Sequence, residues 1–214
     1  MAVKSEREYR DMTMEIRSAE NEEAEQEERK IVTGYASTFN EPYTLYEDDD
    51  WRFNEVVDSK AFDNTDMSDV IMQYDHVGRV FARMSNDTLT VVPNEKGLLI
   101  EADLGGTELG RQLFEEIRGG YTNKMSFGFT VDGEDYLDTK DVDGKALTVR
   151  TITSVRKLYD VSAVSLPAND ATSISVRNLT DGEIERIQAE RLEAERLRLR
   201  KMKLMLEIDL DGGR

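Results

Sequence analysis

The stretch that decides the fold is Lys124-Met125-Ser126-Phe127-Gly128-Phe129-Thr130-Val131, in which large apolar residues alternate with small or polar ones. A period of two residues is the signature of a β-strand, because successive side chains point to opposite faces. We expect the apolar face to lie in the core. Ser126 falls on the opposite face, and Gly128 is expected to leave open space beside it.

Similar runs recur along the chain, so a mainly β protein with helices is expected. The predicted strands are residues 31–39, 68–74, 88–92, 97–103, 124–131, 147–153 and 158–166. Asn94-Glu95-Lys96-Gly97 and Asp141-Val142-Asp143-Gly144 have the composition of hairpin turns. Thr107 can cap a helix over residues 108–118, which Gly119-Gly120 would end. About seven strands in roughly 150 residues favour a small closed barrel or a sandwich.

The composition divides the chain into three parts. Residues 1–30 are polar and include an acidic run at 20–28, which favours a solvated loop or an exposed helical turn. Within this part, residues 8–17 alternate well enough for a strand that could pair with residues 31–36. Residues 31–177 are the β-rich body.

Residues 178–214 form a charged C-terminal tail. Residues 184–206 contain neither Gly nor Pro, and Leu192, Leu199 and Leu206 follow one another at intervals of seven. This pattern predicts a helix with a narrow leucine stripe. Such a helix either lies exposed in solvent or binds a partner or a second copy of the chain.

The composition of the whole chain excludes several classes of function. A formal charge of −17 argues against stable binding to nucleic acid or to an anionic membrane, because phosphate contacts need clustered Lys and Arg. The lack of cysteine excludes disulfides and thiolate metal sites. No signal-peptide pattern and no run of membrane length occurs. We therefore expect a soluble protein that needs no cofactor.

Three residues could carry acid–base and nucleophilic chemistry. His76 is the only histidine, so it is the one imidazole available to transfer protons near neutral pH. Ser126 could act as a nucleophile if a base lies close to it. Asp160 is the one acid in an apolar strand, where its charge needs a partner such as His76 or an Arg or Lys. Asp75 points away from its neighbour His76 if the strand is extended there. Taken singly, each of the three also has an ordinary structural explanation.

Together, the segments around these residues resemble a known family. They are Gln73-Tyr74-Asp75-His76 with Gly78-Arg79, Met125-Ser126-Phe127-Gly128-Phe129, and Leu158-Tyr159-Asp160-Val161-Ser162-Ala163-Val164-Ser165-Leu166-Pro167-Ala168-Asn169. Their order and spacing resemble the prohead maturation proteases of tailed phages, which are relatives of the herpesvirus assemblin proteases. Flanking pieces at residues 31–40, 56–62, 94–98 and 173–177 agree. The similarity spans residues 31–177 and omits the tail.

The resemblance implies a serine endopeptidase that cleaves the major capsid protein and its scaffold segment, and itself, inside an assembling procapsid in the host cytoplasm. It implies that Ser126 is the nucleophile, His76 the general base and Asp160 the third member, at a position where the phage enzymes more usually have Glu. The implied fold is a small closed β-barrel flanked by helices, as in herpesvirus proteases, with the catalytic residues on its outer surface. The alternative is a non-catalytic capsid assembly or scaffolding protein that self-associates through the C-terminal helix.

Overall fold

The computed structural model describes residues 7–12, 17–19 and 29–165, together with residues 186–190, 192–194, 196, 197 and 200 of a C-terminal helix. The chain divides into two compact units, Met1–Ser175 and Val176–Arg214. The second unit contains the described helical residues, and the rest of the tail helix predicted over 184–206 lies outside the described residues. Within the described stretches, no helix combines the length and the apolar character needed to cross a membrane.

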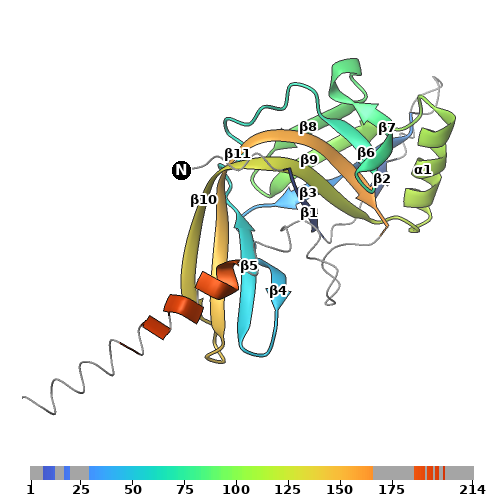
Figure 1. The fold of residues 1–214 in the computed structure, drawn as a ribbon. Helices are drawn as coiled ribbons and strands as arrows, with labels where there is room; N and C mark the ends of the chain where they lie inside the picture. The colour runs from blue at the N-terminus through green and yellow to red at the C-terminus, as the bar shows by residue number, and fades with distance from the viewer. Residues whose placement is uncertain are drawn as a thin grey trace, which may run out of the picture. The chain divides into compact units, whose positions relative to one another are not determined.

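A long antiparallel hairpin of two strands organises the first unit (Figure 1). Its strands are β10 (Lys124–Lys140) and β11 (Ala146–Val164), joined by a turn in which Gly144 has φ of 82°. β11 pairs in parallel with β5 (Trp51–Val57) near one end and with β6 (Ile71–Tyr74) near the other. The hairpin therefore connects strands that do not pair with each other.

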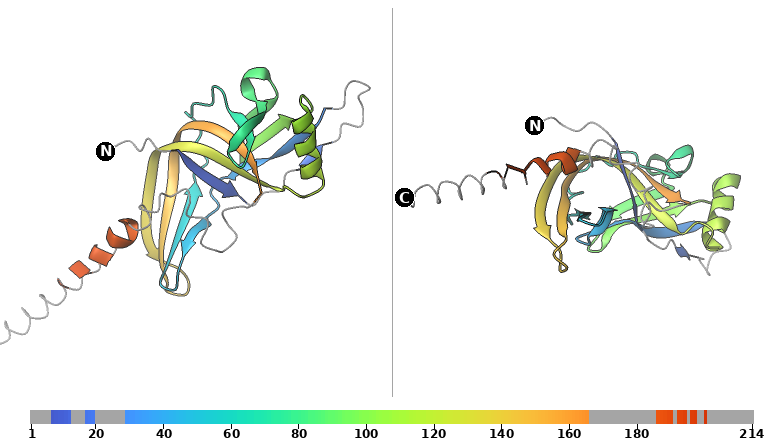
Figure 2. Two further views of the ribbon diagram at one scale, coloured as in Figure 1. Left: turned by 45° about the vertical axis from the view of Figure 1, so that its right-hand side comes forward. Right: turned by 60° about the horizontal axis from the view of Figure 1, so that its bottom comes forward.

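The hairpin bends strongly, as Figure 2 shows from two further directions. Its register shifts several times between Gly128 and Glu134. Each irregularity of this kind bends a strand and increases its twist. Because of this bend, the same two strands run from the part of the sheet that contains β6 to the part that contains β4 and β5 (Figure 1).

Three further strands complete this sheet at its edges. β1 (Glu8–Met12) pairs antiparallel with β10. β4 (Tyr43–Glu47) pairs antiparallel with β5, and β7 (Val77–Arg83) pairs antiparallel with β6. Among the described strands, β10, which contains Ser126, therefore lies between β1 and β11.

The second sheet has the order β2-β3-β9-β8. Its strands are β2 (Arg17–Ala19), β3 (Ile31–Thr38), β9 (Gly97–Asp103) and β8 (Leu89–Pro93), and a short 3₁₀ helix, η1 (Met84–Asn86), precedes β8. The β8–β9 turn is the predicted one, and the Asn94 side chain accepts hydrogen bonds from the backbone N–H groups of Lys96 and Gly97.

The core lies between the sheets and under the helix α1 (Glu108–Arg118). The apolar positions of the opening stretch are all buried, as the alternation predicts: Met125, Phe127, Phe129 and Val131. The helix begins as expected, because the Thr107 side chain accepts a hydrogen bond from the Gly110 N–H. It buries Leu113, Phe114 and Ile117 against the same core.

The mainly β prediction is confirmed, with corrections in detail. Pairings among the described strands give two open sheets, so the closed barrel stays a prediction. Residues 147–153 and 158–166 were expected as two strands, but residues 147–164 lie in the single strand β11; β4, β5 and β7 were not expected. The expected N-terminal pairing is partly wrong, because β1 joins β10 and only β2 joins β3. Residues 13–16, on which that prediction also relied, and the acidic run at 20–28 lie outside the described residues.

Candidate active site

The three candidate side chains come from three places in the fold and meet at one point. Ser126 is on β10 and Asp160 is on β11, where Asp160 stands opposite Gly128 and Ser162 stands opposite Ser126. His76 follows β6, which runs beside this part of β11. Strand pairing alone therefore brings together residues that are 34 to 84 positions apart.

A tight turn, not an extended strand, positions His76. Asp75 and His76 have φ of 49° and 58°, and Gly78 has φ of 78°. The turn is fixed to the end of β11, because the Asp75 N–H donates to the Ala163 carbonyl at 2.9 Å and the Asp75 carboxylate accepts from the Ser165 N–H at 2.9 Å. Asp75 is thus not the partner of His76, but the reason is this turn and not the strand alternation expected from the sequence.

The imidazole of His76 bridges the serine and the acid. Its Nε2 lies 2.5 Å from Ser126 Oγ and its Nδ1 lies 2.5 Å from Asp160 Oδ1. Ser162 adds a hydroxyl that donates to Asp160 Oδ1 at 2.9 Å, and it accepts from the His76 N–H at 3.3 Å. If Nδ1 carries the proton, it donates to Asp160, and Nε2 is free to accept the Ser126 proton.

The Ser126 hydroxyl has a second acceptor. Its Oγ donates to the Arg10 carbonyl at 2.9 Å. The hydroxyl has one hydrogen, so this carbonyl on β1 and the unprotonated Nε2 of His76 share it. The N-terminal strand is therefore part of the site.

The site is covered, contrary to the expectation of open space beside Gly128. A Cβ at position 128 would lie 2.4 Å from Asp160 Oδ2 and 2.8 Å from Cε1 of Tyr9. The Tyr9 ring also lies against the His76 ring, with centroids 4.4 Å apart. Ser126 and Asp160 are both 0% exposed. The space that the glycine provides is occupied by the acid and by Tyr9.

Arg7, just before β1, is a further partner of Asp160. Its guanidinium forms an ion pair with Asp160 Oδ2 and lies over the Tyr159 ring, 4.3 Å from the centroid. The sequence left two kinds of partner open for Asp160, a histidine or an Arg or Lys. The structure has one of each, His76 and Arg7. The sequence does not identify Arg7 or Tyr9, because their partners are assigned only by the pairing of β1 with β10.

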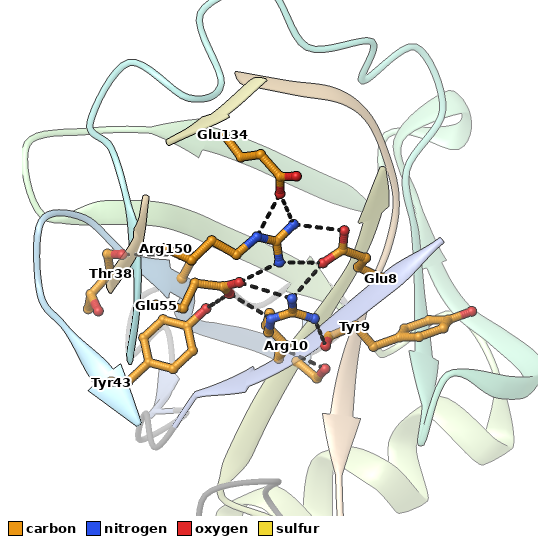
Figure 3. A network of polar contacts seen from close by, with 10 residues as sticks. Glu8, Tyr9, Arg10, Thr38, Tyr43, Glu55, Glu134 and Arg150 are labelled. Carbon is orange, nitrogen blue, oxygen red and sulfur yellow. Dashed lines mark hydrogen bonds and ion pairs between the residues drawn. The ribbon is translucent and has the colours of Figure 1, made fainter. Parts of the chain in front are cut away.

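The opposite face of β1 is anchored in a buried network of charges (Figure 3). Arg10 Nε donates to Glu55 at 2.6 Å, and Arg150 Nη1 donates to both Glu55 and Glu8 at 2.7 Å. Glu134 also pairs with Arg150, while Tyr9 points away from the network in Figure 3. Glu8 and Arg10 thus hold the strand from inside, and Arg7 and Tyr9 extend from its other side.

Burial alone would raise the pKa values of the carboxyl groups in this network. The charges of Arg10 and Arg150 and their hydrogen bonds outweigh that effect and lower the pKa of Glu8 to about 2. The pKa of Glu55 is lowered against the same effect of burial. For Tyr43, whose hydroxyl donates to Glu55, burial and the neighbouring carboxylate both raise the pKa. The carboxyl groups of Glu8 and Glu55 are therefore ionised at neutral pH.

Comparison with protein families finds a match to the family described as caudovirus prohead serine protease, over residues 13–187. Comparisons with curated proteins and with solved structures find no significant match. Among the described residues, no group of three or more His, Asp or Glu side chains is placed to hold a metal ion. The family match covers most of the chain and includes all three candidate residues, so this protein belongs to the caudovirus prohead serine protease family.

Proposed function

We propose that the chain is a serine endopeptidase that cleaves the major capsid protein and its scaffold segment, and itself, during procapsid maturation. It acts inside the assembling procapsid in the host cytoplasm. The observation that carries the proposal is the continuous chain of contacts from Ser126 Oγ through the His76 ring to Asp160 Oδ1, each of 2.5 Å. It occurs in a member of a serine protease family.

In the proposed mechanism Ser126 is the nucleophile and His76 is the general base. Nε2 of His76 takes the hydroxyl proton as Oγ attacks the carbonyl carbon of the scissile peptide. The protonated imidazole then gives this proton to the leaving amine, which departs with the C-terminal fragment. A water molecule, activated by the same nitrogen, hydrolyses the acyl-enzyme and restores Ser126.

Asp160 orients the base and does not itself exchange protons. Its Oδ1 accepts from Nδ1–H, which keeps Nε2 unprotonated and directed at Ser126. Once His76 is protonated, the carboxylate stabilises the imidazolium. An aspartate is sufficient here because β11 places Asp160 directly opposite Gly128, next to the imidazole.

Substrate entry requires a rearrangement of the cover over Ser126. The side chain of Ser126 is fully buried, so a peptide carbonyl reaches Oγ only after neighbouring groups move. Tyr9 and the Arg10 carbonyl are the described groups on β1 that must give way or share the space.

The test is incubation of the wild type and of Ser126→Ala with the cognate capsid protein carrying its scaffold segment. Mass spectrometry of the products should find defined fragments with the wild type only, because loss of a serine nucleophile costs roughly a thousandfold or more. Circular dichroism should find both proteins equally folded. Equal cleavage by a folded Ser126→Ala protein would exclude the proposal.

A further inference from the structure

The two carboxylate oxygens of Asp160 have different partners. Oδ1 faces Nδ1 of His76 and the Ser162 hydroxyl, while Oδ2 is paired with Arg7. The Asp160 side chain has no exposure to water. A buried carboxylate whose partners bind opposite ends cannot rotate without losing one of them.

Arg7 is itself held in place from two directions. Its guanidinium lies over the rings of Tyr159 and Tyr9, at 4.3 and 5.3 Å from their centroids. These contacts suit a planar guanidinium, which stacks on aromatic faces while it donates at its edge. The Arg7 side chain is 33% exposed and that of Asp160 is 0% exposed, so their ion pair is only partly shielded from water.

The strand that follows Arg7 is fixed by its opposite face. Glu8 and Arg10 are buried in the network with Glu55 and Arg150. Because side chains alternate along β1, this anchoring sets where Arg7 and Tyr9 emerge. The guanidinium therefore meets Asp160 as a preorganised donor and not as a mobile surface charge.

We propose that Arg7 is a positioning residue, which clamps Oδ2 of Asp160 so that Oδ1 stays directed at Nδ1 of His76. The proposal rests on the proposed function, since the consequence of the clamp is an imidazole aligned with Ser126. Arg7 also compensates the buried carboxylate whenever His76 is neutral, a state in which Asp160 would otherwise be a charge without a counter-ion. In this role Arg7 acts through Asp160.

A second consequence is electrostatic and has a definite sign. The described ionisable groups around His76 include Asp160, the paired Arg7, Tyr9, and Asp75 in its own turn, whose carboxylate accepts from Ser165. The guanidinium offsets part of the carboxylate's attraction for the imidazolium. Removal of the positive charge should therefore favour protonated His76 and raise its pKa.

The test uses the fact that His76 is the only histidine in the chain. NMR titration of a protein without a histidine tag follows one imidazole, with no need for catalysis. Arg7→Met should raise the titration midpoint by about half a unit or more, and Arg7→Lys should stay near the wild type because it keeps the charge. Arg156→Met is the matched control: it lies on the same strand as Asp160 but pairs with Asp132, in a more exposed ion pair.

Kinetics on a peptide substrate complete the test. Arg7→Met should lower kcat about tenfold or more with little change in KM, because the acid is misplaced while substrate binding is not. The inference is wrong if Arg7→Met has the same titration midpoint as Arg156→Met, even when its kcat falls. The two proposals remain separable: a Ser126→Ala protein that cleaves normally would exclude the protease assignment, whereas the NMR comparison judges Arg7 independently.

Discussion

At the scale of single residues, the site depends on a glycine opposite an aspartate. Gly128 and Asp160 are direct partners across the β10–β11 pairing. Any Cβ at position 128 would lie 2.4 Å from Oδ2, well inside van der Waals contact. The sequence led us to expect that Gly128 leaves open space beside Ser126, but Asp160 occupies that space. The alternation correctly predicts the face on which Ser126 lies, but not what covers it.

Gly128→Ala is therefore expected to displace Asp160 or Tyr9. A shift of about 1 Å in the acid should lower kcat about 100-fold. Peptide hydrolysis measures this effect, and thermal unfolding tests whether the fold survives. The matched control is Gly106→Ala, where an added Cβ meets nothing within 4 Å. Wild-type kcat in Gly128→Ala would show that the close packing around Asp160 is dispensable.

The pH dependence of cleavage should follow His76. An imidazole acts as a base only when neutral, so kcat/KM should rise with pH through about 6 to 7.5. The chain has no other histidine and no cysteine that could substitute. Initial rates on a peptide substrate between about pH 5 and 9 give the profile. A rate that does not change across this range would point to a base other than His76.

At the scale of elements, β1 links the interior of the fold to the site. One face carries Glu8 and Arg10 into the buried network, and the other side brings Tyr9 to His76, with Arg7 at its start reaching Asp160. The strand also supplies the Arg10 carbonyl that accepts from Ser126. Removing a charge of this network should therefore lower the stability of the fold directly. It should lower activity indirectly, because β1 would no longer be held in place beside the site.

Stability should fall in acid because of Glu8. Its pKa is depressed from 4.5 to about 2 in the folded protein, which corresponds to about 3 kcal/mol of stabilisation. This contribution is complete above pH 4.5, the unfolded value, and is lost as the pH falls toward 2. Urea unfolding at several pH values measures it.

Glu8→Gln should flatten the dependence of the unfolding free energy on pH in that window. Glu47→Gln is the control, because Glu47 pairs with Arg52 and Lys145 at the surface, where solvent screens the interaction. Parallel curves for the wild type and Glu8→Gln would mean that Glu8 is not a source of acid sensitivity.

The elements that the sequence predicts are those with local signals. The helix α1 has a cap and a regular apolar face, and both hairpin turns have their characteristic residues. The polar residues Ser154, Arg156 and Lys157 hide the continuity of β11, and the charged Glu55 interrupts the otherwise apolar buried face of β5. His76, Ser126 and Asp160 could be named because each is chemically unusual in its segment. Arg7 could not, since its contact with Asp160 spans 153 residues and depends on strand pairing.

At the scale of the whole molecule, the family match ends at residue 187, while the first compact unit ends at Ser175. Residues 188–214 thus lie outside the family match. The leucine spacing of the tail, at Leu192, Leu199 and Leu206, favours a helix that associates with a partner or a second copy. We expect the tail to direct association or entry into the procapsid and to contribute little to the chemistry.

A chain that ends at Arg177 should therefore stay folded and cleave a short peptide, but fail to enter procapsids. An exposed extension can be removed at little cost when few contacts cross its junction. Circular dichroism checks that the shortened chain is folded, peptide cleavage checks its activity, and analysis of purified procapsids checks whether it is incorporated. Unfolding of the shortened chain, or its normal incorporation, would contradict the assignment of the tail.

The most direct measurement of the central claim is covalent labelling by a fluorophosphonate, which reacts with a serine only when a neighbouring base activates it. Mass spectrometry of the digested protein locates the adduct. We predict one adduct, on Ser126, formed faster as the pH rises and lost in both Ser126→Ala and His76→Ala. An adduct on another serine, or labelling of Ser126 that persists at the wild-type rate in folded His76→Ala, would contradict the account.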